Sequence, residues 1–119
     1  MNAVTTLHKN GWIAACHLND LIPNSGICAL FQGQPVAIYY LPEETPSLYA
    51  LSNWDPIGKA SVMSRGILGS IGDALVIASP LYKQHFSLVT GTCLEQPEHC
   101  LQSYAVRLVE KNIELRVMP

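Results

Sequence analysis

The chain has 119 residues, a formal net charge of −2, 49% hydrophobic residues and 13% charged residues. This length suits one domain spanning residues 1–119, and the composition excludes disorder, which needs low hydrophobicity and high net charge. No cluster of Lys and Arg offers the phosphate contacts that dominate nucleic-acid binding, and no run approaches the roughly 20 apolar residues that span a bilayer.

Short β-rich runs alternate with Gly, Pro, Asn and Asp, which favours an all-β fold, an antiparallel β-sandwich or barrel with little helix. Single helical turns are expected within Asn19–Ile22 and Lys59–Ser64, and tight turns at Gly33–Pro35 and Gly72–Asp73. The predicted strands are Trp12–His17, Gly26–Phe31, Val36–Tyr40, Leu48–Ser52, Gly66–Ile71, Leu75–Ala78, Phe86–Val89, Tyr104–Val109 and Ile113–Val117.

The last two runs give the clearest prediction, a C-terminal hairpin in which apolar and charged residues alternate. Ile113, Leu115 and Val117 alternate with Glu114 and Arg116. Because successive side chains on a strand point to opposite faces, this pattern predicts that the apolar residues face the core and the charged residues face solvent.

The four cysteines are Cys16, Cys28, Cys93 and Cys100, and they include no Cys-x-x-Cys pair. The chain start lacks the basic segment and apolar run of a secretory signal, so reduced thiols and a cytoplasmic protein are expected. The spacing of Cys93 and Cys100, with His99 beside them, matches no common zinc site. A loop thiol and a solvent histidine are therefore expected there.

Two segments carry the most informative residues. The first is Ala50-Leu51-Ser52-Asn53-Trp54-Asp55-Pro56-Ile57, and the second is Ser79-Pro80-Leu81-Tyr82, which leads into Phe86-Ser87-Leu88-Val89-Thr90-Gly91. They resemble the two ligand loops of Rieske iron–sulfur proteins, which run Asn-x-Cys-Pro-His and Cys-Pro-x-His. In this comparison Asp55 and Ser79 stand at the cysteine positions, and Ile57 and Tyr82 stand at the histidine positions.

These four substitutions do not suit a Rieske centre, whose irons are held by two thiolates and two imidazole nitrogens. Ile57 has no lone pair, and Asp55, Ser79 and Tyr82 offer only oxygen, which suits hard cations. We therefore expect a Rieske-type fold without a [2Fe–2S] cluster and without a metal ion.

More narrowly, the chain resembles the small subunit of NAD(P)H-dependent nitrite reductase, whose bacterial members carry Asp-Pro in the first loop. The runs that carry this resemblance are Ala78–Phe86, Gly26–Leu30, Pro35–Ile38, Ser64–Ile67 and Thr90–Leu94. The resemblance implies an accessory subunit of a cytoplasmic oxidoreductase that reduces nitrite to ammonia. It further implies that the large subunit carries the flavin, the sirohaem and the iron–sulfur cluster, and that this chain has no catalytic residue or cofactor and a structural or allosteric role.

Trp54, Ile57, Leu81 and Tyr82 are expected to meet where the two loops converge. They form either a small apolar core that fills the space of the missing cluster or a surface that docks on the large subunit. The small core is favoured, since few residues act as interface hot spots. His85 follows the second loop and is expected to be a solvated loop histidine, because no nearby carboxylate in the sequence would adjust its pKa.

Two other functions stay open. One is a Rieske-type electron-transfer ferredoxin with atypical ligands, which iron analysis and the visible spectrum would reveal. The other is a stand-alone β binding module, which co-purification with a nitrite reductase large subunit would exclude.

Overall fold

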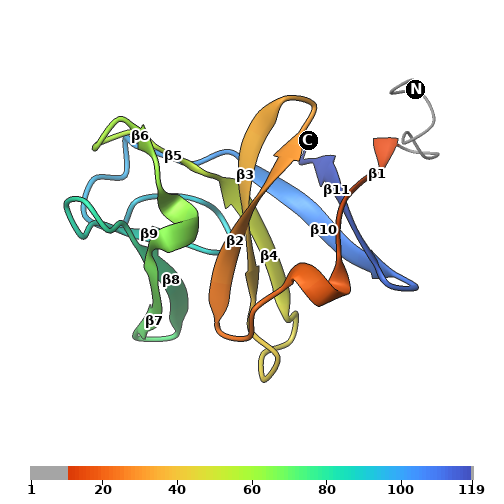
Figure 1. Ribbon diagram of the computed structural model, residues 1–119. Coiled ribbons are helices and arrows are strands. Elements are labelled where there is room, and N and C mark those ends of the chain that lie inside the picture. The colour runs from red at the N-terminus through yellow and green to blue at the C-terminus, as the bar shows by residue number, and fades with distance from the viewer. Residues whose placement is uncertain (1–10, 119) are drawn as a thin grey trace.

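The computed structural model describes residues 11–118, which form a β-rich fold with short 3-10 turns (Figure 1). The strands are β1 (Ile13–His17), β2 (Ser25–Phe31), β3 (Gln34–Tyr40), β4 (Leu48–Ser52), β5 (Trp54–Asp55), β6 (Ala60–Ser61), β7 (Ile67–Ile71), β8 (Ala74–Ala78), β9 (His85–Ser87), β10 (Ser103–Val109) and β11 (Asn112–Val117), and the 3-10 turns are η3 (Leu18–Asp20) and η4 (Met63–Arg65). Each predicted strand is present, with ends shifted by at most two residues. The expectation about a secretory signal concerns the chain start, which lies outside the described residues.

Every strand pair is antiparallel. A six-stranded sheet has the order β1-β11-β10-β4-β3-β2, a three-stranded sheet has the order β7-β8-β9, and β5 pairs with β6. Figure 1 shows the smaller sheet and the β5–β6 pair at one end of the molecule, with the β10–β11 hairpin at the other. The antiparallel all-β prediction is therefore confirmed.

Strand β3 is buried on both faces, and its alternating side chains enter two different cores. Ala37 and Tyr39 belong to a core between the two sheets, here called the intersheet core, with Leu41, Tyr49, Leu51, Met63, Ile77, Phe86, Leu88, Cys93 and Leu101. Val36 and Ile38 belong to a second core, here called the large-sheet core, with Leu21, Phe31, Ala50, Ile113 and Leu115. Both faces of β3 are therefore covered, and this one strand contributes side chains to both cores.

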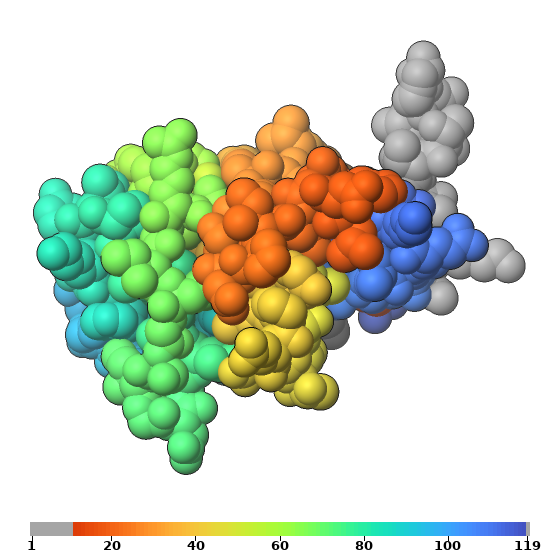
Figure 2. Space-filling model, turned by 60° about the horizontal axis from the view of Figure 1, so that its bottom comes forward, coloured from red at the N-terminus to blue at the C-terminus, as the bar shows by residue number. Residues whose placement is uncertain are grey.

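The link between β3 and the smaller sheet is also polar. The hydroxyl of Tyr39 donates a hydrogen bond of 2.7 Å to the carbonyl of Met63, in η4. Strand β2 packs beside the same turn, and Figure 2 shows its orange surface next to the green surface of the segment around η4. These contacts fix the start of β7, which is separated from η4 by Gly66 alone.

The C-terminal hairpin forms as predicted, but the expected orientation of two of its residues is wrong. Glu114 is buried, with 2% of its surface exposed, whereas Val117, the last residue of β11, is 49% exposed. Arg107, opposite Glu114 in the β10–β11 register, bonds the carboxylate at 2.8 Å and stacks over Trp12 at 4.1 Å. Arg116 lies over the same ring at 4.7 Å. The ion pair therefore allows the charged side chain of Glu114 to be buried at a position where the alternating pattern alone predicts exposure to solvent.

The turns lie close to their predicted positions. The β2–β3 turn falls at Gln32 and Gly33, whose φ angles are 50° and 81°, one residue earlier than expected. Two successive positive φ angles fit a type I′ hairpin, whose twist matches that of the flanking strands. The two predicted helical segments each overlap a 3-10 turn in part: η3 begins one residue before the first segment and is capped by the side chain of His17, and η4 ends one residue after the second.

Candidate functional site

The first of the two segments that resemble ligand loops is anchored by a buried amide. Asn53 is 3% exposed, its Oδ1 accepts the backbone N–H of Ser64 at 2.6 Å, and its Nδ2 donates to Ser61 Oγ at 2.8 Å. The backbone N–H of Lys59 donates to the carbonyl of Asp55 at 2.7 Å and closes the loop. The loop conformation is thus set by its own residues and by η4.

The second loop joins β8 to β9 and is closed by backbone hydrogen bonds. The N–H of Ser79 donates to the Gln84 carbonyl at 2.9 Å, and the N–H of Lys83 donates to the Ser79 carbonyl at 3.1 Å. Lys83 has a φ of 64°, which lets the chain reverse within this short loop.

The two cysteine-equivalent positions are in direct contact. Ser79 Oγ donates to Asp55 Oδ2 at 2.5 Å, and both residues are buried, with exposed fractions of 1% and 0%. The other carboxylate oxygen of Asp55 accepts the backbone N–H groups of Ile57 and Gly58, at 2.8 and 3.0 Å. Three donors therefore satisfy a buried carboxylate, and one of them joins the two loops.

This arrangement does not fit a [2Fe–2S] cluster. A hydroxyl and a carboxylate 2.5 Å apart leave no room for an iron atom between them, and neither is a thiolate. Ile57 has no donor atom, and its side chain packs against the intersheet core. Tyr82 is 64% exposed and would supply a phenol in place of an imidazole. The four positions therefore hold the loops together without providing a Rieske ligand set.

The expected small core of Trp54, Ile57, Leu81 and Tyr82 is wrong for three of its four members. Trp54 is 48% exposed, Leu81 45% and Tyr82 64%, and only Ile57 is packed inward. The space between the two loops is filled by the Asp55 and Ser79 side chains and by the close approach of the loops to each other. A Cβ added at Gly58 would lie 2.5 Å from Leu81 Cδ1 and 2.9 Å from Asp55 Oδ2. The three exposed apolar side chains are thus left at the surface.

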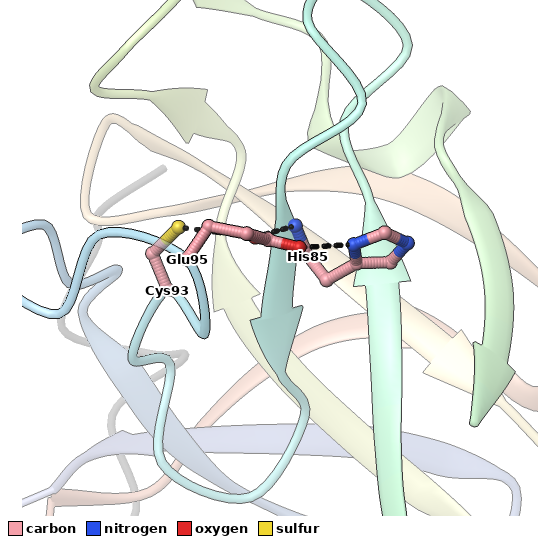
Figure 3. A network of polar contacts seen from close by, with 3 residues as sticks. All are labelled: His85, Cys93 and Glu95. Atoms are coloured by element: carbon pink, nitrogen blue, oxygen red, sulfur yellow. Dashed lines mark hydrogen bonds and ion pairs between the residues drawn. The ribbon is translucent and has the colours of Figure 1, made fainter. Parts of the chain in front are cut away.

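His85 is not a freely solvated histidine, because the carboxylate that the sequence did not indicate comes from Glu95. As Figure 3 shows, Glu95 lies between Cys93 and His85. Its Oε2 is 2.6 Å from His85 Nδ1, and its Oε1 accepts the backbone N–H of His85 at 2.8 Å. That N–H, followed by the imidazole, lowers the pKa of Glu95. The pair fixes the orientation of the imidazole at the start of β9.

The cysteines near His99 do not form a cation site with it. Cys93 is buried in the intersheet core, and burial raises the pKa of its thiol, which donates to Glu95 Oε1 at 3.7 Å. Cys93 therefore lies in the segment between β9 and β10 but is a core thiol, whereas Cys100 is exposed. No group of three or more His, Cys, Asp or Glu side chains within residues 11–118 is arranged to hold a metal ion.

The same part of the chain contains no helix long and apolar enough to cross a membrane. All four cysteines are free thiols. The solvent-exposed thiols Cys28 and Cys100 lie in different elements, one on β2 and the other after β9.

Comparison with known proteins gives consistent matches over nearly the whole described chain. Residues 11–116 match the family of Rieske-like [2Fe-2S] domains. The nitrite reductase (NADH) small subunit of Salmonella typhimurium is 38% identical over 105 residues, covering 88% of this chain and 96% of that protein. The solution structure of the nitrite reductase [NAD(P)H] small subunit of Erwinia carotovora is 39% identical with a TM-score of 0.74, covering 91% of this chain and 82% of that one.

A third relative differs in length. The nitrite reductase [NAD(P)H] large subunit of Klebsiella oxytoca is 32% identical over 102 residues, which cover 86% of this chain but only 10% of that protein. A segment like this chain is therefore part of a much longer polypeptide in that organism. Taken with the small-subunit matches, these findings show that the chain belongs to the family of nitrite reductase small subunits, built on the Rieske-like domain.

Proposed function

We propose that this chain is a clusterless accessory subunit that binds the large subunit of a cytoplasmic NADH-dependent nitrite reductase. The observation that carries the clusterless role is the hydrogen bond between Asp55 and Ser79, which joins the two cysteine-equivalent positions directly. Electron transfer through a Rieske centre would need thiolates and imidazoles at the four loop positions. The chain has none of them there.

The docking surface that we propose is the loop tip, defined as Trp54, Ile57, Leu81 and Tyr82. Three of these side chains are exposed on loops held by a buried hydrogen bond, so the apolar surface is presented on a fixed framework. Large aromatic side chains on a rigid framework are the usual anchors of protein interfaces. A relative whose large subunit includes a segment similar to this chain supports a stable association between the two parts.

In this proposal the chemistry belongs to the large subunit, which by family resemblance carries the flavin, sirohaem and iron–sulfur cluster and reduces nitrite to ammonia. We assign no catalytic residue to this chain. Its contribution is to hold a part of the large subunit in place through the loop tip. The four free thiols suit a reducing cytoplasm, where the nicotinamide coenzyme is also available.

The test is co-purification of the tagged chain with the large subunit encoded by the same genome. The double variant Trp54→Ala/Tyr82→Ala is expected to weaken the complex by at least tenfold in Kd, since aromatic anchors often cost 2 kcal/mol or more when truncated. The control is Leu108→Ala/Val109→Ala, which removes exposed apolar side chains from β10. It is expected to leave the Kd unchanged.

Three results would contradict the proposal. A colour and stoichiometric iron in the anaerobically purified small subunit would show a cluster. Equal binding by the tip variant and the control would exclude the loop tip as the docking surface. Unchanged activity and thermal stability of the large subunit after removal of the small subunit would exclude the supporting role.

A further inference from the structure

A pocket of about 500 Å³ lies at the base of the second loop, beside the loop tip. Its wall includes the side chains of Arg65, Lys83 and His85, and its apolar part includes Ile67 and Ala78. Three potentially cationic groups thus surround a pocket with an apolar lining, in a chain whose formal net charge is −2.

The register of the smaller sheet explains this clustering. Ile67 pairs with Ala78, and Ala78 pairs with His85, so the three residues form one row across β7, β8 and β9. Arg65 lies two residues before β7, and Lys83 lies two residues before β9. Because β7 and β9 both run antiparallel to β8, they begin at the same end of the sheet, and the segments that precede them each bring a cation to that end.

The charges of Arg65 and Lys83 are not neutralised within the described chain. Among residues 11–118, no carboxylate oxygen lies within 4 Å of the side-chain nitrogens of either residue. The carboxylate of Glu95 contacts His85 instead. His85 is oriented by that bond through Nδ1, and Figure 3 shows its other ring nitrogen on the side away from Glu95. The pocket therefore presents two free cations and one oriented imidazole.

The surroundings favour a protein carboxylate over a free small anion. Ile67, at the pocket, is 75% exposed, and the loop residues Leu81 and Tyr82, between the pocket residues Pro80 and Lys83, are 45% and 64% exposed. A small anion would neutralise the cations but leave this apolar surface in water. A protein segment would cover both, and a carboxylate facing Arg gains charge-assisted hydrogen bonds.

We propose that this pocket receives a carboxylate of the large subunit, either an Asp or Glu side chain or the C-terminal carboxylate, next to the apolar contact at the loop tip. The inference rests on the proposed function and adds the chemistry of the partner. The cations supply charge recognition, and the apolar loop tip supplies buried area.

The experiment measures the Kd between the purified large subunit and the small subunit with the single variants Arg65→Met and Lys83→Met, then with both together. Methionine keeps a flexible, unbranched side chain but removes the charge and the N–H donors. The double variant is expected to raise the Kd by about 10- to 100-fold, and the single variants by less. The control Lys111→Met, at the exposed β10–β11 turn, is expected to change it less than twofold.

Salt provides a second readout. Raising NaCl from about 0.05 to 0.5 M is expected to weaken binding of the unaltered small subunit and of Lys111→Met. Salt weakens this binding because exposed charges are screened within a few ångströms at high ionic strength. The double variant should respond much less, because it lacks the two charges that salt would screen. Thermal melting of each variant is the control for folding, and the melting temperatures should match that of the unaltered protein.

Several outcomes would overturn the inference. If the double variant binds as well as the unaltered protein, the pocket receives no carboxylate, while the proposed function still stands. If sedimentation shows a salt-sensitive dimer of the small subunit that the double variant abolishes, the pocket belongs to a second copy. If the unaltered small subunit does not bind the large subunit at all, the proposed function fails and this inference fails with it.

Discussion

Asp55 and Ser79 stand at the two positions where a Rieske protein has cysteines, and they join the same two loops by a hydrogen bond. A Rieske protein joins these positions through iron, whereas here a hydroxyl donates directly to a carboxylate. The backbone N–H groups of Ile57 and Gly58 complete the set of donors around Asp55. The buried charge is tolerated because each of its oxygens has a partner.

Removing the hydroxyl should therefore destabilise the protein. Ser79→Ala is expected to lower the free energy of unfolding by about 1–3 kcal/mol, because it leaves a buried carboxylate oxygen without its donor. Urea denaturation measures the change, with Ser70→Ala on the exposed part of β7 as the control. A loss no larger than that of the control would show that the bond contributes nothing to stability.

At this scale the sequence predicted the positions but not their contacts. Asp55 and Ser79 were identified by loop resemblance, yet they are separated by 24 residues, so their bond depends on how two sheets meet. The partner of His85 was missed for a similar reason. Glu95 is ten residues away and reaches His85 only because the chain turns back after β9. The exposure of Trp54, Leu81 and Tyr82 could not be predicted, because a polar pair fills the space assigned to them.

Among the elements, β9 and the segment that follows it are held together by Glu95. The Leu94 N–H donates to the His85 carbonyl at 2.8 Å, and Glu95 accepts the His85 N–H at the same distance. These two contacts attach the segment after β9 to His85, the first residue of this three-residue strand. This attachment places His85 at the pocket wall.

The attachment should make stability depend on pH in the acid range. The pKa of Glu95 is lowered from its usual 4.5 in the folded state, so its contribution is present above about pH 4.5 and is lost as the pH falls through the folded-state pKa. The urea midpoint of Glu95→Gln should lie below that of the unaltered protein at pH 6, and the two should converge as the pH falls below the folded-state pKa of Glu95. Glu98→Gln, at an exposed position, is the control, and a constant difference across this range would contradict the prediction.

For the molecule as a whole, β3 is the element that both cores share. Residues 36–39 are fully buried, and alternate side chains enter the large-sheet core and the intersheet core. The β-rich runs between Gly, Pro, Asn and Asp predicted the strands of both sheets, but they did not predict the sheet order or the two-sided burial of β3. Those features depend on long-range pairing, such as that of β1 with β11, which a local pattern does not specify.

The shared strand predicts that both sheets unfold together. Ile38→Ala in the large-sheet core and Ile77→Ala in the intersheet core are each expected to lower the free energy of unfolding by about 2–5 kcal/mol. In each variant, the transitions followed by circular dichroism and by fluorescence of Trp12 and Trp54 should coincide. Ile71→Ala, exposed on β7, serves as the control. Because both tryptophans lie outside β7–β9, a circular dichroism transition of Ile77→Ala that precedes its fluorescence transition would show that the smaller sheet unfolds separately.

The bond between Asp55 and Ser79 has a consequence for how the protein is made. Both groups that join the loops are side chains of the polypeptide itself, so the loops can close as soon as the chain leaves the ribosome. In the clusterless subunit that we propose, no cluster-assembly machinery would have to reach them, and oxygen would have no cluster to attack at this junction. The amount of folded subunit should accordingly follow the rate of its synthesis, even when iron or sulfide is scarce.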